Sequence, residues 1–180
     1  MNDSINSKIK TRISEDLSPT RNITGFHLKI ISAIAIIWSL FQLWYASPFP
    51  FMLNIGMFKG LPARAIHLGF ALTLAFLIYP ISKGKRISFF DVIISFIGAF
   101  SCLYIYFFYD QLVERGGVLL SLNLGNNFNF PIELILGGCG ILILLEATRR
   151  AIGFPLVIIA SCFLLFSYFG RYAPEIISHG

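Results

Sequence analysis

The residues best placed to do chemistry in this 180-residue chain are Glu146, Arg149 and Arg150, which stand inside an otherwise apolar stretch. Helix positions three and four apart share one face, so the spacing predicts a pair between Glu146 and Arg150 and leaves Arg149 free to point elsewhere. Such a set can act as a charged gate or as a contact to a partner subunit. It can equally be a stop signal that orients a membrane helix, and the sequence leaves these alternatives open.

Two carboxylates could in principle form an acid/base pair, and Glu133 and Glu146 are the obvious candidates. They stand thirteen residues apart on one predicted helix, which separates them by about 20 Å. They cannot act on one bond, and the sequence shows no nucleophile beside a base. We therefore expect no catalytic residue and no enzymatic activity.

Three further residues are weaker candidates. Asp91 falls in the first turn of a predicted helix, where the helix dipole favours an anion. Arg64 and His67 stand three apart and so share a helix face. They could meet an anionic substrate or the Glu133 carboxylate, or form a polar contact between helices. Neither the histidines nor the cysteines show metal-ligand spacing, so we expect no metal site and no cofactor-binding site in this chain.

Composition points to a membrane protein. The chain is 56% hydrophobic and 13% charged, whereas about a quarter of the residues of a soluble domain are charged. Its net charge of +5 does not indicate nucleic-acid binding, because the basic residues lie between apolar segments. The sequence predicts an all-α, polytopic membrane helical bundle of four to five transmembrane helices.

The apolar segments divide the chain into three parts. Residues 1–25 are expected to be a disordered cytoplasmic tail, residues 26–151 a four-helix membrane unit, and residues 152–180 a fifth transmembrane helix with an exit segment. The expected crossings are 26–46, 62–81, 87–109, 131–151 and 155–170. Residues 47–60 are too short and too rich in proline to span, and they predict an interfacial or re-entrant loop. Residues 110–130 predict a polar loop with room for a short surface helix before Gly116.

The basic residues predict the orientation. With the N-terminus in the cytoplasm, ten of the fourteen Lys and Arg residues fall on the tail side of the membrane. The outer four are Lys59, Arg64, Arg115 and Arg171. The excess of positive charge on cytoplasmic segments favours this arrangement, with five crossings and the C-terminus outside.

One long run carries a resemblance to a known family. Residues 144–156 read LLEATRRAIGFPL and residues 166–180 read FSYFGRYAPEIISHG. They resemble the tripartite ATP-independent periplasmic (TRAP) transporter permeases, above all the TAXI-type branch, in which a small four-helix part is fused to a twelve-helix part. The resemblance covers roughly residues 64–180, and its specific part is 144–174.

The resemblance implies a function. The chain would be the small-subunit-like membrane component of a secondary transporter that imports an organic anion, driven by an ion gradient. The implied partners are a large transport subunit or fused C-terminal transport domain, a periplasmic substrate-binding protein and the lipid bilayer, but no nucleic acid. A sodium ion is implied for the complete transporter and none for this chain. The implied location is the bacterial inner membrane, crossed several times, with the N-terminus cytoplasmic.

Two questions remain open in the sequence. The unpartnered fifth segment favours a fragment of a fused permease over a separate subunit. The alternative function is a membrane scaffold or assembly protein with no transport role.

Overall fold

The computed structural model describes residues 20, 25–58, 60–81, 87–116, 118–120, 122–123 and 129–170. These form six helices: α2 (Phe26–Ala46), α3 (Phe49–Leu53), α4 (Gly60–Ile78), α5 (Phe89–Glu114), α6 (Ile132–Ala151) and α7 (Phe154–Phe169). A two-residue antiparallel pair, β1 (Leu122–Asn123) with β2 (Asn129–Phe130), lies between α5 and α6. The predicted all-helical class is confirmed for this part of the chain. Apart from residues 20 and 25, the predicted tail lies outside the described residues, as does the exit segment 171–180.

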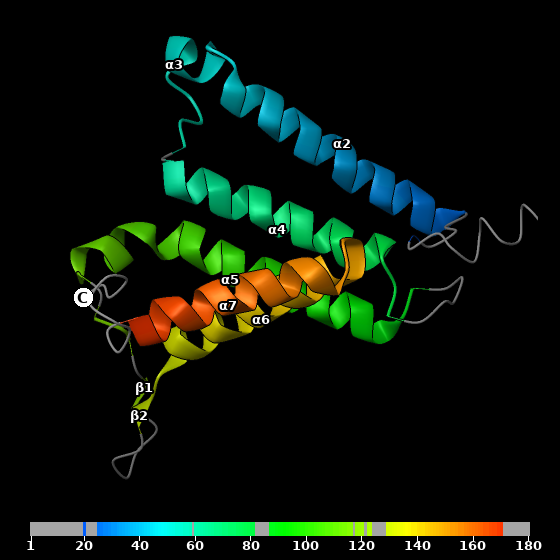
Figure 1. Ribbon diagram of the computed structural model, residues 1–180. Coiled ribbons are helices and arrows are strands. Elements are labelled where there is room, and N and C mark those ends of the chain that lie inside the picture. The colour runs from blue at the N-terminus through cyan, green and yellow to red at the C-terminus, as the bar shows by residue number, and fades with distance from the viewer. Residues whose placement is uncertain are drawn as a thin grey trace, which may run out of the picture.

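The long helices run alternately in opposite directions (Figure 1). The start of α2, the end of α4, the start of α5 and the turn between α6 and α7 therefore meet at one end of the bundle, which we call the Arg150 end. The end of α2, the start of α4, the end of α5 and the start of α6 meet at the other, the Arg115 end (Figure 1).

Three helices are long and apolar enough to cross a membrane: α2, α4 and α5. Helix α6 has 20 residues, but four of them are charged. Helix α7 is apolar but has only 16 residues. The structure thus supports a membrane-embedded protein with three candidate spans, and the predicted four to five crossings are not confirmed by length and composition.

Three predicted boundaries differ from the structure. Helix α4 runs from Gly60 to Ile78 instead of over 62–81. Helix α5 continues to Glu114, so the expected separate surface helix after residue 109 is instead the last turns of one helix. Within the expected loop 47–60, residues 49–53 form the short helix α3, which ends at Asn54 in the left-handed conformation with φ 55°.

The turn between α6 and α7 depends on Gly153. Its φ of 108° is a backbone conformation that only glycine adopts without strain. Pro155 follows within the first turn of α7, where its missing N–H removes no helical hydrogen bond.

The core is small and centres on α4. Phe76 is fully buried and packs with Leu72, Cys102 and Ala147, which joins α4 to α5 and α6. The helices approach closely at Gly98, where an added Cβ would lie 3.0 Å from Cγ2 of Ile143 and 3.3 Å from Cδ1 of Leu72.

The glycine-rich run GGCG at 137–140, whose small side chains could let a neighbouring helix approach closely, does so only in part. Gly140 would place a Cβ 3.6 Å from Ser101, whereas a Cβ at Gly137 or Gly138 would meet no described atom within 4 Å.

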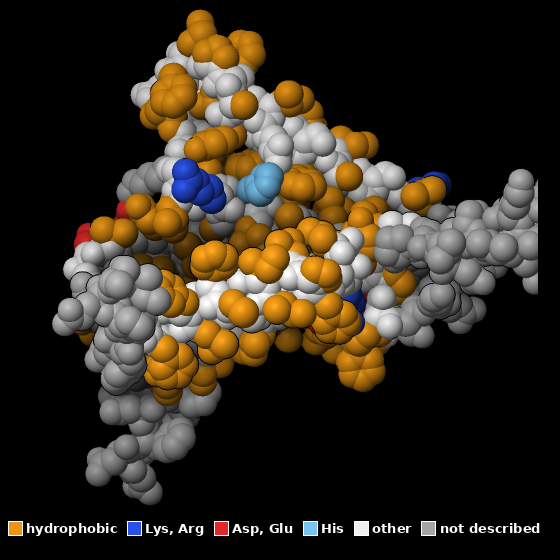
Figure 2. All heavy atoms as spheres, in the orientation of Figure 1, with side chains coloured by type: hydrophobic (Ala, Val, Ile, Leu, Met, Phe, Trp, Pro, Cys, Tyr) orange, Lys and Arg blue, Asp and Glu red, His pale blue; other side chains and the backbone are white. Residues whose placement is uncertain are grey.

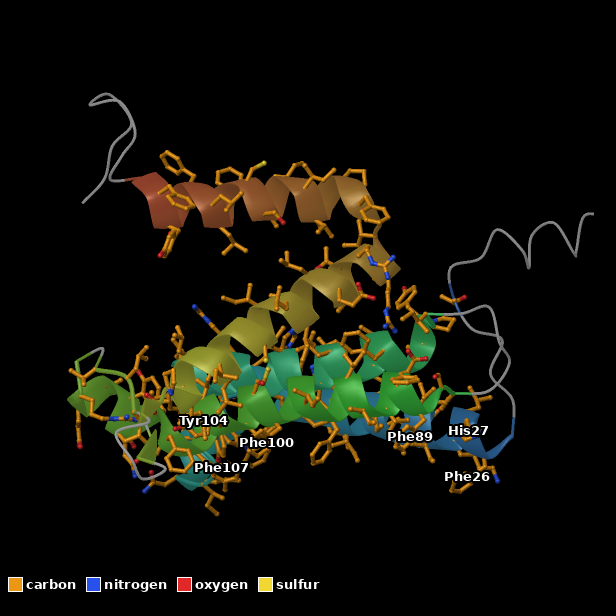
Figure 3. All side chains as sticks on the ribbon, turned by 90° about the horizontal axis from the view of Figure 1, so that it is seen from below. Phe26, His27, Phe89, Phe100, Tyr104 and Phe107 are labelled. Carbon is orange, nitrogen blue, oxygen red and sulfur yellow. The ribbon has the colours of Figure 1, made fainter. Side chains whose placement is uncertain are left out.

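Most large apolar side chains lie on the outside. Figure 2 shows hydrophobic side chains spread over the visible helices, and α7 has no buried residue at all. Figure 3 shows α7 set apart from the layer of α2, α4 and α5, with α6 between them. Exposed apolar surface on this scale indicates contact with lipid or with another membrane protein.

Candidate functional site

Arg150 is the centre of an ionic cluster at the Arg150 end of the bundle. Its Nη1 donates to Oδ1 of Asp91 at 2.7 Å, and its Nε donates to Oε1 of Glu146 at 2.8 Å. A longer contact of 3.4 Å joins Nη1 to the carbonyl of Tyr79, just past the end of α4. The guanidinium also lies 4.8 Å from the ring centroid of Phe76, a distance at which a cation and an aromatic face attract.

Arg149 belongs to the same cluster. It donates through both Nε and Nη2 to the two carboxylate oxygens of Glu146, each at 2.7 Å. The expectation that Arg149 would be free to point elsewhere was wrong, because a carboxylate accepts a planar, two-pronged guanidinium and still has a lone pair for Arg150. The residue that reaches another helix is Arg150.

Burial separates the two arginines. The side chains of Arg150 and Asp91 are 3% and 0% exposed, whereas those of Arg149 and Glu146 are 35% and 29% exposed. Two carboxylates and two guanidinium groups balance in formal charge, which lowers the cost of placing them in an apolar environment. The cluster therefore ties the end of α4, the start of α5 and the end of α6 together.

Asp91 lies in the first turn of α5, as its position in the sequence predicts, and it is buried. Its pair with Arg150 was not predicted, because the two residues lie on different helices. An i, i+4 spacing reveals contacts within one helix, whereas this one depends on how α5 and α6 pack.

Glu133 anchors a second cluster, at the Arg115 end. Its carboxylate accepts from Arg115 Nη2 at 2.6 Å, from the Tyr104 hydroxyl at 2.9 Å and from the Leu120 amide at 2.7 Å. The Glu133 side chain is 3% exposed. Its hydrogen bond with Arg115 raises the pKa of that guanidinium above its already high usual range. Tyr104, Arg115 and Leu120 were missed at the sequence level, since nothing in their spacing marks them as partners of Glu133.

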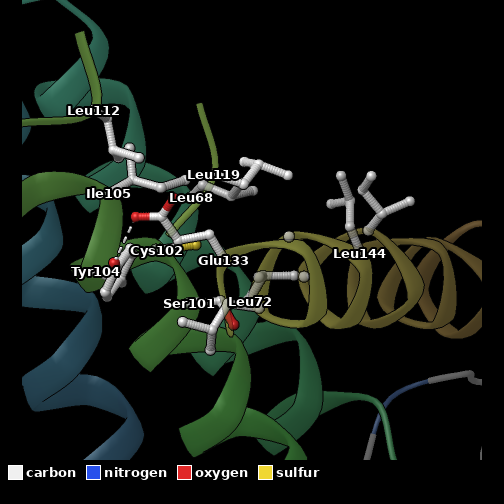
Figure 4. Close-up of a pocket in the computed structure, with 14 residues that line it drawn as sticks. Leu68, Leu72, Ser101, Cys102, Tyr104, Ile105, Leu112, Leu119, Glu133 and Leu144 are labelled. Atoms are coloured by element: carbon white, nitrogen blue, oxygen red, sulfur yellow. Dashed lines mark hydrogen bonds between the residues drawn. The ribbon is translucent and has the colours of Figure 1, made fainter. Parts of the chain in front are cut away.

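A cavity of about 360 Å³ lies beside Glu133, between α4, α5 and α6. Figure 4 shows Leu68, Leu72 and Leu144 among the side chains around it, with the Glu133 carboxylate bonded to Tyr104 at one side. Both Glu133 oxygens accept hydrogen bonds from the protein. The carboxylate is thus engaged in holding structure, and the rest of the lining suits apolar groups.

Arg64 and His67 do not meet Glu133. Within the described residues, the partners of Glu133 are those of the second cluster, while His67 lies against α2. Its Nδ1 lies 2.6 Å from Gln42 Nε2 and 3.3 Å from Trp38 Nε1. Of the alternatives left open, the polar contact between helices is the one present at His67.

Together these contacts place the candidate residues in three separate groups. Glu133 and Glu146 lie at opposite ends of α6, and Arg64 and His67 lie on α4 facing α2. In the part of the chain that the structure describes, no three His, Cys, Asp or Glu side chains come together to hold a metal ion. The arrangement can bind helices to one another and can present a cation at a surface. No family model, curated protein or solved structure matches this chain.

Proposed function

We propose that this chain is the small-subunit-like membrane component of a TRAP-type secondary transporter in a bacterial inner membrane. The complete transporter would import an organic anion, delivered by a periplasmic binding protein and driven by an ion gradient. The observation that carries the proposal is the place of the family-like Glu-Ala-Thr-Arg-Arg run. Its Glu146, Arg149 and Arg150 make up most of the cluster that ties α4, α5 and α6 together.

The proposed orientation has the N-terminus and the Arg150 end in the cytoplasm. Lys29, Arg149 and Arg150 belong to that end, while Arg64 and Arg115 belong to the other. The Arg150 end thus carries more basic residues than the Arg115 end, and an excess of basic residues favours a cytoplasmic position for that end.

Helices α6 and α7 cross as well in this proposal, which gives five spans. Helix α6, with 20 residues, is about 30 Å long, the thickness of the hydrocarbon core. Its charged residues lie in its first turn and its last two turns and are paired by Arg115 or within the Arg150 cluster. Helix α7, with 16 residues, is about 24 Å long, a mismatch that local thinning of the bilayer can accommodate.

The proposed role is that of a scaffold for a larger transport part. Substrate sites of secondary transporters are built from broken helices near the membrane midplane. Each of the long helices described here is continuous. The two ionic clusters lie at the ends of the bundle. Substrate and sodium would therefore bind the large subunit or fused transport domain, and the exposed faces of α6 and α7 offer surface for it.

Reporter fusions and affinity purification together test this proposal. A reporter fused after Arg86 should lie in the cytoplasm and one fused after Ala173 outside. The tagged chain, solubilised in mild detergent, should co-purify with a large polytopic membrane protein encoded beside it or continuous with it. Reporters on the same side, or a chain that purifies alone from its native membrane, would count against it.

A scaffold or assembly protein with no transport role is the second candidate. It is favoured by the ion pairs of both clusters, which form between residues of this chain and tie its helices together. A large membrane partner that co-purifies, while anion uptake is unchanged when the chain is deleted, would select this candidate.

A further inference from the structure

A polar hollow opens between α2 and α4 at the Arg115 end. It encloses about 350 Å³ and is lined by Phe41, Gln42, Tyr45, Ala46, Ala63, Arg64 and His67. In Figure 2 a basic and a histidine side chain lie next to each other in the space between these helices. The hollow is distinct from both ionic clusters.

The contacts of His67 indicate which of its two ring nitrogens carries the proton. Trp38 Nε1 can only donate a hydrogen bond, and it donates to Nδ1 of His67 at 3.3 Å. The amide nitrogen of Gln42, also a donor, lies 2.6 Å from the same atom. Nδ1 is therefore the acceptor, so the neutral ring carries its proton on Nε2. No hydrogen bond joins Nε2 to a described residue, so this N–H remains available to a ligand.

Arg64 adds a positive charge that nothing in the hollow balances. Among the described residues Arg64 makes no ion pair, whereas Arg115, Arg149 and Arg150 each bind a carboxylate. None of the described residues that line the hollow is Asp or Glu. The guanidinium brings five N–H donors in a planar fork that matches the oxygens of a phosphate or carboxylate. The hollow is therefore complementary to an anion.

The surroundings favour a lipid over a solute. Trp44 and Tyr45 stand at the end of α2 beside the hollow, and such residues gather at the level of lipid headgroups. A guanidinium at that level can pair with the phosphate oxygens of a headgroup.

We propose that this hollow binds the phosphodiester headgroup of an anionic phospholipid, with Arg64 as its charged ligand and the His67 ring N–H as a second donor. An anionic lipid is preferred to a zwitterionic one because the lining has no carboxylate to pair with a choline or ethanolamine ammonium. The site does not depend on the transport proposal, since it requires only a bilayer.

Native mass spectrometry of the full chain in neutral detergent tests the site. Phosphatidylglycerol and phosphatidylcholine with identical acyl chains are titrated in parallel, each with and without glycerol 3-phosphate or succinate. Wild-type protein should retain phosphatidylglycerol about tenfold more tightly, equivalent to about 1.4 kcal/mol, because the choline ammonium of phosphatidylcholine would lie beside the Arg64 charge with no described carboxylate to pair with it. Equal retention of the two lipids would overturn the proposal. Displacement of the lipid by glycerol 3-phosphate or succinate would make the hollow a solute site and would also overturn it.

Variants of Arg64 test whether this residue causes the tighter retention of phosphatidylglycerol. Arg64→Gln should lower phosphatidylglycerol retention to the level of phosphatidylcholine, and Arg64→Lys, which keeps the charge but loses the fork, should fall between. Lys29→Gln is the matched control, because it removes one exposed positive charge from the other end of α2 and should leave retention unchanged. An equal loss in Lys29→Gln would show general attraction to basic protein and contradict the site.

Discussion

Arg150 and Asp91 are separated by 59 positions in the chain, yet their Nη1 and Oδ1 atoms lie 2.7 Å apart. Their side chains are 3% and 0% exposed, the most deeply buried ion pair among the described residues. The pair joins the first turn of α5 to the last turn of α6, and Arg150 also reaches the carbonyl of Tyr79 after α4. It fixes the relative position of three helices at one end of the bundle.

Breaking this pair should cost far more than breaking the exposed one beside it. Asp91→Ala leaves the Arg150 charge buried without its interhelical partner, so the free energy of unfolding should fall by about 3–5 kcal/mol. Arg149→Ala should cost about 0.5 kcal/mol, because its pair with Glu146 is partly exposed and lies within one helix. Denaturant unfolding in detergent micelles measures both, and equal losses would contradict the assignment.

Replacing Arg149 by lysine should leave the stability of the protein nearly unchanged, whereas replacing Arg150 by lysine should lower it. Arg150 donates from Nε to Glu146 and from Nη1 to Asp91 at the same time, a fork that a single ammonium group cannot copy. Arg150→Lys should therefore lower stability by about 1–3 kcal/mol through an acceptor left unsatisfied. Arg149→Lys serves as the control and should stay within about 0.5 kcal/mol. If both variants unfold like wild type, the turn contributes only to orientation.

The sequence predicts the helices better than it predicts their contacts. The bounds of α2, α6 and α7 match expectation closely, because glycine or proline lies at or next to an end of each of these apolar runs. The end of α5 was missed because Tyr109 and Asp110 look like the start of a loop, although nothing in them prevents the helix from continuing. The Asp91–Arg150 pair requires the relative positions of α5 and α6, which no periodicity within one helix contains.

The Glu133 cluster should slow amide hydrogen exchange in the backbone that follows α5. The Leu120 amide donates to Glu133 Oε2 at 2.7 Å, and a hydrogen-bonded amide exchanges its proton slowly. Glu133→Ala should raise the exchange rate of that amide by about tenfold, as followed by hydrogen–deuterium exchange. Glu114→Ala, at the exposed end of α5, is the control and should leave the rate unchanged. A Leu120 amide that exchanges equally fast in wild type and Glu133→Ala would argue against the contact.

Gly98 and Gly137 lie on facing helices. A larger side chain should destabilise the protein at Gly98 but have little effect at Gly137. At Gly98 an added Cβ already lies 3.0 Å from Ile143, so Gly98→Val should push α5 and α6 apart and lower stability by about 1–3 kcal/mol. At Gly137 no described atom lies within 4 Å, so Gly137→Val should change stability by no more than about 0.5 kcal/mol. Thermal unfolding in detergent compares them, and the reverse order would show that the α5–α6 packing is wrong.

Anion uptake by cells that lack this chain tests the transport proposal most directly. A panel of radiolabelled carboxylates and sulfonates is offered to the parent strain, to the deletion strain and to the deletion strain carrying the wild-type gene. The account predicts that uptake of at least one anion is lost on deletion, returns with the wild-type gene, and disappears in the parent strain when ionophores collapse the ion gradients. Unchanged uptake of every anion in the deletion strain, in medium where the parent strain makes the chain, would contradict a role in transport.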